Sequence, residues 1–70
     1  MNFIELLSFS KVFSVAFGLD NVRILTKLDL EITEKALERR ADELPYLSPE
    51  QRETYKFLLD FVKEKVKTYI

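Results

Sequence analysis

The sequence predicts an α+β fold in which an N-terminal antiparallel β-hairpin packs on two antiparallel α-helices, in the order ββαα. Residues 7–17 and 22–32 both alternate between apolar and polar side chains, and a short segment with the only glycine separates them. Residues 34–44 and 49–69 carry apolar side chains at helical spacing. The alternative is an all-α three-helix bundle in which the opening segment is helical.

The chain is short for a domain that folds unaided. Its 70 residues are expected to form a single domain, 1–70, near the lower size limit for a self-sufficient core. Cysteine and histidine are both absent, which excludes disulfides and the common zinc sites. Oligomerisation is then the remaining way to stabilise a thin core. The net charge of −1 provides no overall field that would attract nucleic acid or anionic lipid.

The two predicted strands agree about one face of the hairpin. In 22–32 (VRILTKLDLEI) the even positions are apolar apart from a threonine, and most odd positions are charged. In 7–17 (LSFSKVFSVAF) the odd positions are apolar apart from a lysine. With a four-residue loop between the strands, Phe17 pairs with Val22 and both apolar sets share a face. A slip of one residue would turn one set outward, so this register is favoured.

The helical alternative for the opening segment depends on four apolar residues at heptad spacing, Leu6, Phe9, Phe13 and Ala16. Polar and charged side chains would then scatter around much of the helix, which favours the hairpin. The pattern leaves open whether residues 1–6 extend the first strand or form a helical turn.

Two helix starts can be identified. Thr33 is the expected N-cap of the helix 34–44. Ser48 is the expected N-cap of the helix 49–69, in a capping box with Gln51. The first helix is about half as long as the second, so the two helices leave part of the apolar hairpin face uncovered. We therefore expect dimerisation to complete the core.

Surplus apolar surface predicts an interface with a second copy of the chain and with an unidentified protein. Phe57 and Phe61 lie beside the main apolar stripe of the second helix rather than within it. A two-stranded sheet also has two open edges. The residues expected at the interface are Phe9, Phe13, Phe17, Phe57, Phe61 and Tyr69.

No catalytic constellation can be identified in the sequence. Without histidine or cysteine, catalysis would depend on carboxylates, lysines, tyrosines or serines. The acidic pairs Glu34–Glu38 and Asp60–Glu64 have i,i+4 spacing, but an oxygen-ligand metal site needs more ligands. One glycine is too few for a glycine-rich phosphate loop. We expect a protein that is not an enzyme and that binds no cofactor and no metal.

The N-terminal apolar run is not expected to be a membrane segment. It is interrupted by Glu5 and Lys11, and it is too short and too polar to span a bilayer. The expected location is therefore the cytoplasm, without a membrane partner.

From Thr26 onward the expected order of strand, capped helix, turn and serine-initiated helix resembles the ribbon-helix-helix regulators, whose dimeric strands enter the major groove of DNA. Arg23 and Lys27, on the polar face of the second strand, are the candidate nucleic-acid contacts. The chain departs from that pattern, since an additional strand precedes the ribbon and the connection 45–50 lacks glycine. The first hypothesis is therefore a homodimeric interaction module or regulator that docks on another macromolecule, and DNA binding is the second.

Overall fold

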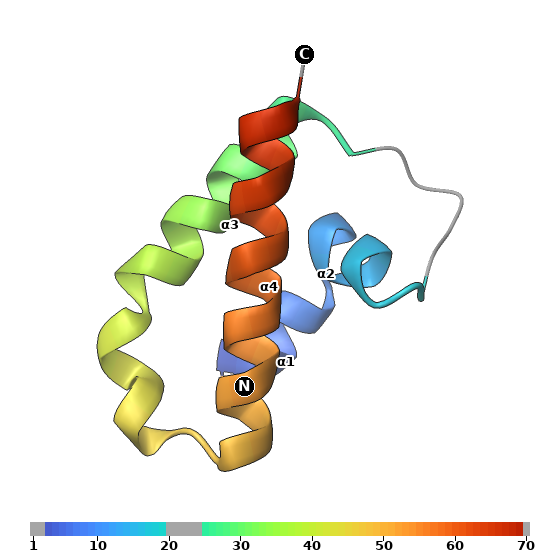
Figure 1. Ribbon diagram of the computed structural model, residues 1–70. Helices are drawn as coiled ribbons and strands as arrows, with labels where there is room; N and C mark the ends of the chain where they lie inside the picture. The colour runs from blue at the N-terminus through green and yellow to red at the C-terminus, as the bar shows by residue number, and fades with distance from the viewer. Residues whose placement is uncertain (1–2, 20–24, 70) are drawn as a thin grey trace.

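The fold is all-α rather than α+β (Figure 1). The computed structural model describes residues 3–19 and 25–69, and within these ranges it contains helices and no strand. In chain order the elements are α1 (Phe3–Ser8), α2 (Lys11–Ala16), α3 (Lys27–Arg39), the 3₁₀ helix η1 (Ala41–Tyr46) and α4 (Pro49–Thr68). The expected β-hairpin is therefore wrong, and the all-α alternative agrees with the structure.

The segment expected to be the second strand, 22–32, contains the start of α3. The Thr26 hydroxyl accepts from the Asp29 backbone N–H at 3.1 Å, and the Asp29 carboxylate accepts from the Thr26 N–H at 3.1 Å. This reciprocal capping box favours a helix directly after Thr26. Leu30 is buried and Leu28 is exposed, because residues two apart lie about 200° apart around a helix. The alternation that predicted a strand thus does not match the pattern of burial.

The expected helix 34–44 is displaced along the chain, since α3 begins at residue 27 and ends at residue 39. Thr33, the expected N-cap, is buried inside α3. Its hydroxyl donates to the Asp29 carbonyl at 2.9 Å, so its hydrogen bond is satisfied without ending the helix. The end of the expected helix belongs to η1, which contains Pro45.

The segment expected to be the first strand, 7–17, contains parts of two short helices. The Ser8 hydroxyl donates to the Glu5 carbonyl at 2.7 Å in α1. The Ser10 hydroxyl accepts from the Phe13 N–H at 2.9 Å and caps α2. These serines, which alternate with apolar residues in the sequence, therefore accompany the end of one helix and the start of the next. A single continuous opening helix is also excluded by this break.

α3 and α4 run antiparallel, side by side, and α2 packs against both of them (Figure 1). The bounds of α4 lie within one residue of the expected range 49–69. The capping box expected at its start is present. The Ser48 hydroxyl accepts from the Gln51 N–H at 3.2 Å, and the Gln51 side chain accepts from the Ser48 N–H at 3.1 Å.

The buried core lies where α3 and α4 meet each other and the N-terminal helices. Its hydrophobic members among the described residues are Leu7, Val12, Leu30, Leu37, Tyr55, Leu58 and Val62. Tyr55 crosses from α4 to α3, and its hydroxyl donates to the Leu37 carbonyl at 2.7 Å. That carbonyl belongs to the last turn of α3, where it also accepts from the Arg40 N–H at 3.2 Å. The tyrosine thus links the end of α3 to the middle of α4.

Candidate interaction surface

Helix α4 is apolar on two of its sides. Tyr55, Leu58 and Val62 are buried on the first side, within the core. Phe57 points about 100–160° away from these residues around the helix, on a second side. Half of its surface is exposed (50%). Phe61, one turn further along the same helix, is half-buried and packs against the core.

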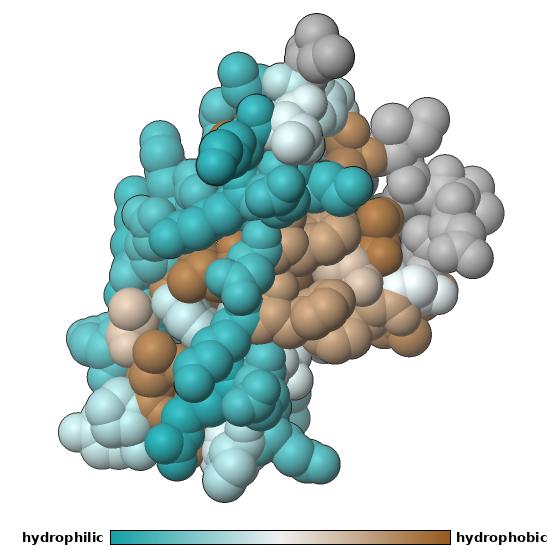
Figure 2. All heavy atoms as spheres, viewed as in Figure 1, coloured by the Kyte–Doolittle hydropathy of each residue, from teal (hydrophilic) through white to brown (hydrophobic). Residues whose placement is uncertain are grey.

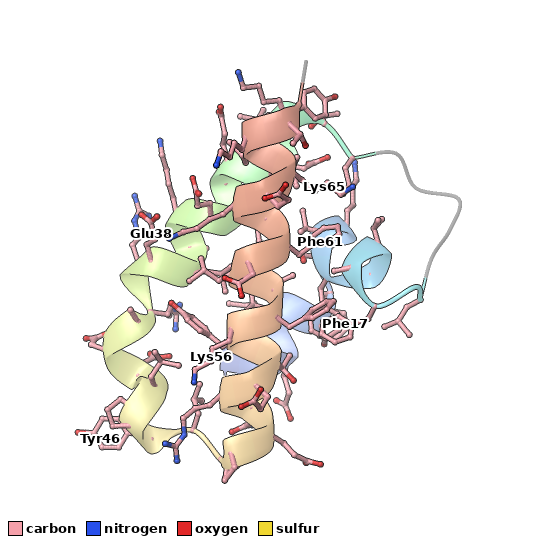
Figure 3. The ribbon with its side chains drawn as sticks, viewed as in Figure 1. Phe17, Glu38, Tyr46, Lys56, Phe61 and Lys65 are labelled. Atoms are coloured by element: carbon pink, nitrogen blue, oxygen red, sulfur yellow. The ribbon has the colours of Figure 1, made fainter. Side chains whose placement is uncertain are left out.

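Aromatic rings from α2 and α4 meet on this second side. Phe13 and Phe17 are one helical turn apart, and their ring centroids lie 4.6 Å apart in a stacked arrangement. The Phe17 centroid lies 5.0 Å from that of Phe57, with the ring planes tilted by 48°. These separations are typical of favourable aromatic pairs. Figure 3 shows Phe17 and Phe61 on the same side of α4. We name Phe13, Phe17, Phe57 and Phe61 the aromatic face.

The aromatic face adjoins a segment without charge. Residues 12–19 contain no Asp, Glu, Lys or Arg. Phe17 remains 39% exposed although it contacts two other rings. Figure 2 shows an apolar patch on this side of the molecule, next to the hydrophilic surface that covers much of the rest of the view. Contiguous exposed apolar surface of this kind often marks an interaction site.

Of the six expected interface residues, ring contacts join Phe13, Phe17 and Phe57, and Phe61 lies on the same side of α4, although the strands that were to position them are absent from the described ranges. Phe9 lies in the turn between α1 and α2 and is 77% exposed, outside these ring contacts. Tyr69 follows α4, and its hydroxyl donates to the Leu25 carbonyl at 3.4 Å. Tyr69 lines a pocket at the edge of the aromatic face, which it shares with Phe61.

Two further exposed apolar side chains were not expected. Leu28 and Ile32 lie one turn apart on α3 and are both exposed. The hairpin prediction had placed them on the buried face of a sheet. The signal that could have corrected this is the pairing of Thr26 with Asp29, which indicates a helix start.

The candidate nucleic-acid contacts do not form a basic sheet face. Arg23 lies outside the described residues, and Lys27 is the first residue of α3. The residues from Thr26 onward that were to form the ribbon are a cap and a helix instead. The likeness to ribbon-helix-helix regulators therefore loses its structural basis.

In residues 3–19 and 25–69, no group of three or more Asp or Glu side chains is placed to hold a metal ion. Within the same ranges, no helix is both long enough and apolar enough to cross a membrane.

Comparison with known proteins gives no family for this chain. No protein-family model, curated protein or solved structure matches it.

Proposed function

We propose that this chain is a non-enzymatic interaction module that associates with a second copy of itself through the aromatic face. The observation that supports the proposal is the ring contact of Phe17 with both Phe13 and Phe57 beside an uncharged segment. Aromatic side chains are enriched, and charged side chains depleted, in the centres of protein interfaces. The two rings of Phe17 and Phe57 already contact each other, so little side-chain freedom is lost when a partner covers them.

The lack of charge in residues 12–19 favours a second copy as the partner. In a two-fold symmetric dimer, residues close to the axis meet the same residues of the other copy. A charged side chain at that position would therefore face its own like charge, which opposes association. Residues 12–19 carry no charge, so two copies can bring these segments together without repulsion.

The size of the core favours the same partner. Among the side chains whose burial the structure describes, in 5–19 and 25–69, seven hydrophobic ones are buried, and two of these, Leu7 and Val12, come from the N-terminal helices. Small domains bury a low fraction of their surface, and oligomerisation is one way to bury more. Covering the aromatic face would add apolar burial to this small core. The reason for expecting a dimer is thus no longer an uncovered hairpin but an uncovered side of α4 and α2.

Sedimentation velocity over a concentration series tests the proposal, with Phe57→Glu as the disrupting variant. We expect the unmodified chain to dimerise and Phe57→Glu to weaken dimerisation by about tenfold or more, since it removes an anchor ring and adds like charges. Phe57 is half exposed, so the substitution should leave the fold intact, which far-UV circular dichroism would verify.

The matched control is Tyr46→Glu. Tyr46 is 89% exposed and lies on η1, away from Phe17 and Phe61 (Figure 3). The change from an aromatic ring to a carboxylate is the same, but dimerisation should be unaffected. A chain that stays monomeric at every concentration would overturn the proposal, as would equal effects of the two substitutions.

A further inference from the structure

A pocket of about 330 Å³ opens between α2, the start of α3 and the end of α4. It is lined by Val15, Leu25, Leu30, Phe61, Lys65 and Tyr69. Leu30 is buried, and Val15, Leu25 and Phe61 are half-buried, so the walls are mostly apolar and partly covered by the fold. The volume is at the small end of the range for sites that bind small molecules.

Two polar groups accompany these apolar walls, the Lys65 ammonium and the Tyr69 hydroxyl. The Lys65 Nζ lies over the Phe61 ring, 5.7 Å from its centroid. Lys65 forms no ion pair with any residue that the structure describes. Figure 3 shows Lys65 and Phe61 on the same side of α4. The pocket therefore combines an apolar interior with one positive charge that no carboxylate of the described chain neutralises.

We propose that this pocket binds a small amphipathic carboxylate, with its apolar body against Leu30 and Phe61 and its carboxylate on Lys65. An apolar body gains from leaving water for these walls. A carboxylate gains a charge-assisted hydrogen bond from the ammonium, which a neutral group of the same shape gains only weakly. A cationic ligand would meet a like charge at the same place. The site takes a small molecule, so it goes beyond the proposed dimerisation, and it does not require a second copy although Val15 and Phe61 also belong to the proposed interface.

The test uses two probes that differ only in the charged group, 4-phenylbutyrate and 4-phenyl-1-butanol. Each is titrated into the ¹⁵N-labelled full chain while backbone amide signals are followed. We expect saturable shifts concentrated at Val15, Leu25 and Lys65, and an affinity for the acid about tenfold higher than for the alcohol.

The variant Lys65→Met tests the role of the ammonium. It keeps an unbranched apolar side chain beside Phe61 but removes the charge, so the acid should lose its advantage of about tenfold while the alcohol binds as before. The matched control is Lys67→Met, an exposed lysine of the same helix that does not line the pocket. That variant should retain the preference for the acid.

Several results of these titrations would contradict the proposed site. Equal affinities of acid and alcohol for the unmodified chain would overturn the proposal, and so would equal effects of Lys65→Met and Lys67→Met. Shifts that never saturate, or that centre on Phe57 instead of the pocket, would also overturn it. The variant Phe57→Glu keeps the pocket residues, so binding of the acid by that variant would support the site even if the chain proves to be monomeric.

Discussion

The helical pair α3–α4 and the N-terminal pair α1–α2 are stabilised in different ways. α3 and α4 have 13 and 20 residues, each begins with a capping box, and together they supply most of the buried side chains. α1 and α2 have six residues each, and among the described side chains they bury one apiece, Leu7 and Val12. Helices of six residues are not stable alone in water. The pair α3–α4 is therefore the stable framework, and α1–α2 depends on it.

The two sides of α4 differ in the same way, since one contributes to stability and the other to the candidate interface. The side of α4 that faces α3 is buried, and the side that faces α2 carries a half-exposed ring, Phe57. The short helix α2 therefore covers α4 incompletely and contributes Phe17 to the surface that remains. The weakly held region and the candidate interface are consequently the same part of the molecule.

The largest expected effect comes from shortening a buried side chain of the α3–α4 framework. Leu58 is fully buried in α4, and Leu58→Ala should reduce the free energy of unfolding by about 2–5 kcal/mol through lost burial and the cavity left behind. Val12 of α2 is also buried, but Val12→Ala removes two methyl groups and should cost about 2 kcal/mol. Urea unfolding followed by circular dichroism measures both values.

The two substitutions should also differ in which helices they destabilise. Leu58→Ala should destabilise the whole chain, so that α1–α2 and α3–α4 both unfold at a lower urea concentration. Val12→Ala should affect α1 and α2 more than α3 and α4, because the framework keeps its own contacts. If Val12→Ala cost as much as Leu58→Ala and acted on the whole chain, the separation into framework and dependent region would be wrong.

The sequence predicts the start of α4 correctly but not the start of α3, and the reason is physical. The start of α4 is encoded by adjacent residues, because Ser48 and Gln51 complete their capping box locally. The start of α3 is encoded in the same way by Thr26 and Asp29, but the alternation in 22–32 obscures it. A period of two is persuasive only when a sheet exists to bury one face, and the core instead takes side chains from α3 at helical spacing.

The candidate interface illustrates a related ambiguity. Phe13 and Phe17 are four residues apart, and four is both an even spacing and one helical turn. The two rings therefore share a face whether the segment is a strand or a helix, which explains how the wrong fold still placed them together. The contact between Phe17 and Phe57 joins distant parts of the chain, and no local pattern encodes it. What the sequence does show is that Phe57 lies off the main apolar stripe of its helix.

A smaller effect is expected at the hydrogen bond that closes the framework. Tyr55→Phe removes the hydroxyl that donates to the Leu37 carbonyl and should reduce the free energy of unfolding by about 1 kcal/mol. The loss stays near this value because the carbonyl also accepts from the Arg40 N–H at 3.2 Å. Tyr46→Phe makes the same chemical change at a tyrosine that is 89% exposed, and unfolding of that variant should be unchanged.

The same tyrosine predicts a loss of stability at high pH. Burial raises the pKa of Tyr55 above its ordinary value of 10.0, and the negative charge of Glu38 adds to the increase. Above pH 10.0 the unfolded chain releases this proton while the folded chain retains it, so stability falls as pH rises. Tyr55→Phe should lose less stability over that range than the unmodified chain. Equal losses would show that the hydroxyl is not the group responsible.

The smallest expected effect lies at the boundary between the two regions, where Lys11 of α2 approaches Asp29 of α3. The backbone N–H of Thr26 donates to the Asp29 carboxylate and holds its pKa below the ordinary value of 3.8, with a smaller contribution from the Thr26 side chain. Desolvation opposes this lowering, and the Lys11 charge adds the smallest contribution to it. The stabilisation is therefore present above pH 3.8 and is lost as pH falls through the lower folded-state pKa. An NMR pH titration of the Asp29 carboxyl carbon measures this pKa directly.

The capping box of α4 supplies the internal control for this titration. Its acceptor is the neutral Gln51 side chain, which does not gain a proton in acid, whereas the acceptor of the α3 box does. Acid should thus weaken the amide protection of Thr26 but not that of Ser48. Lys11→Met should raise the Asp29 pKa slightly, because α2 then no longer places a positive charge near the start of α3. If Lys11→Met left that pKa unchanged, α2 would contribute packing alone to the framework, and its dependence on α3–α4 would be entirely apolar.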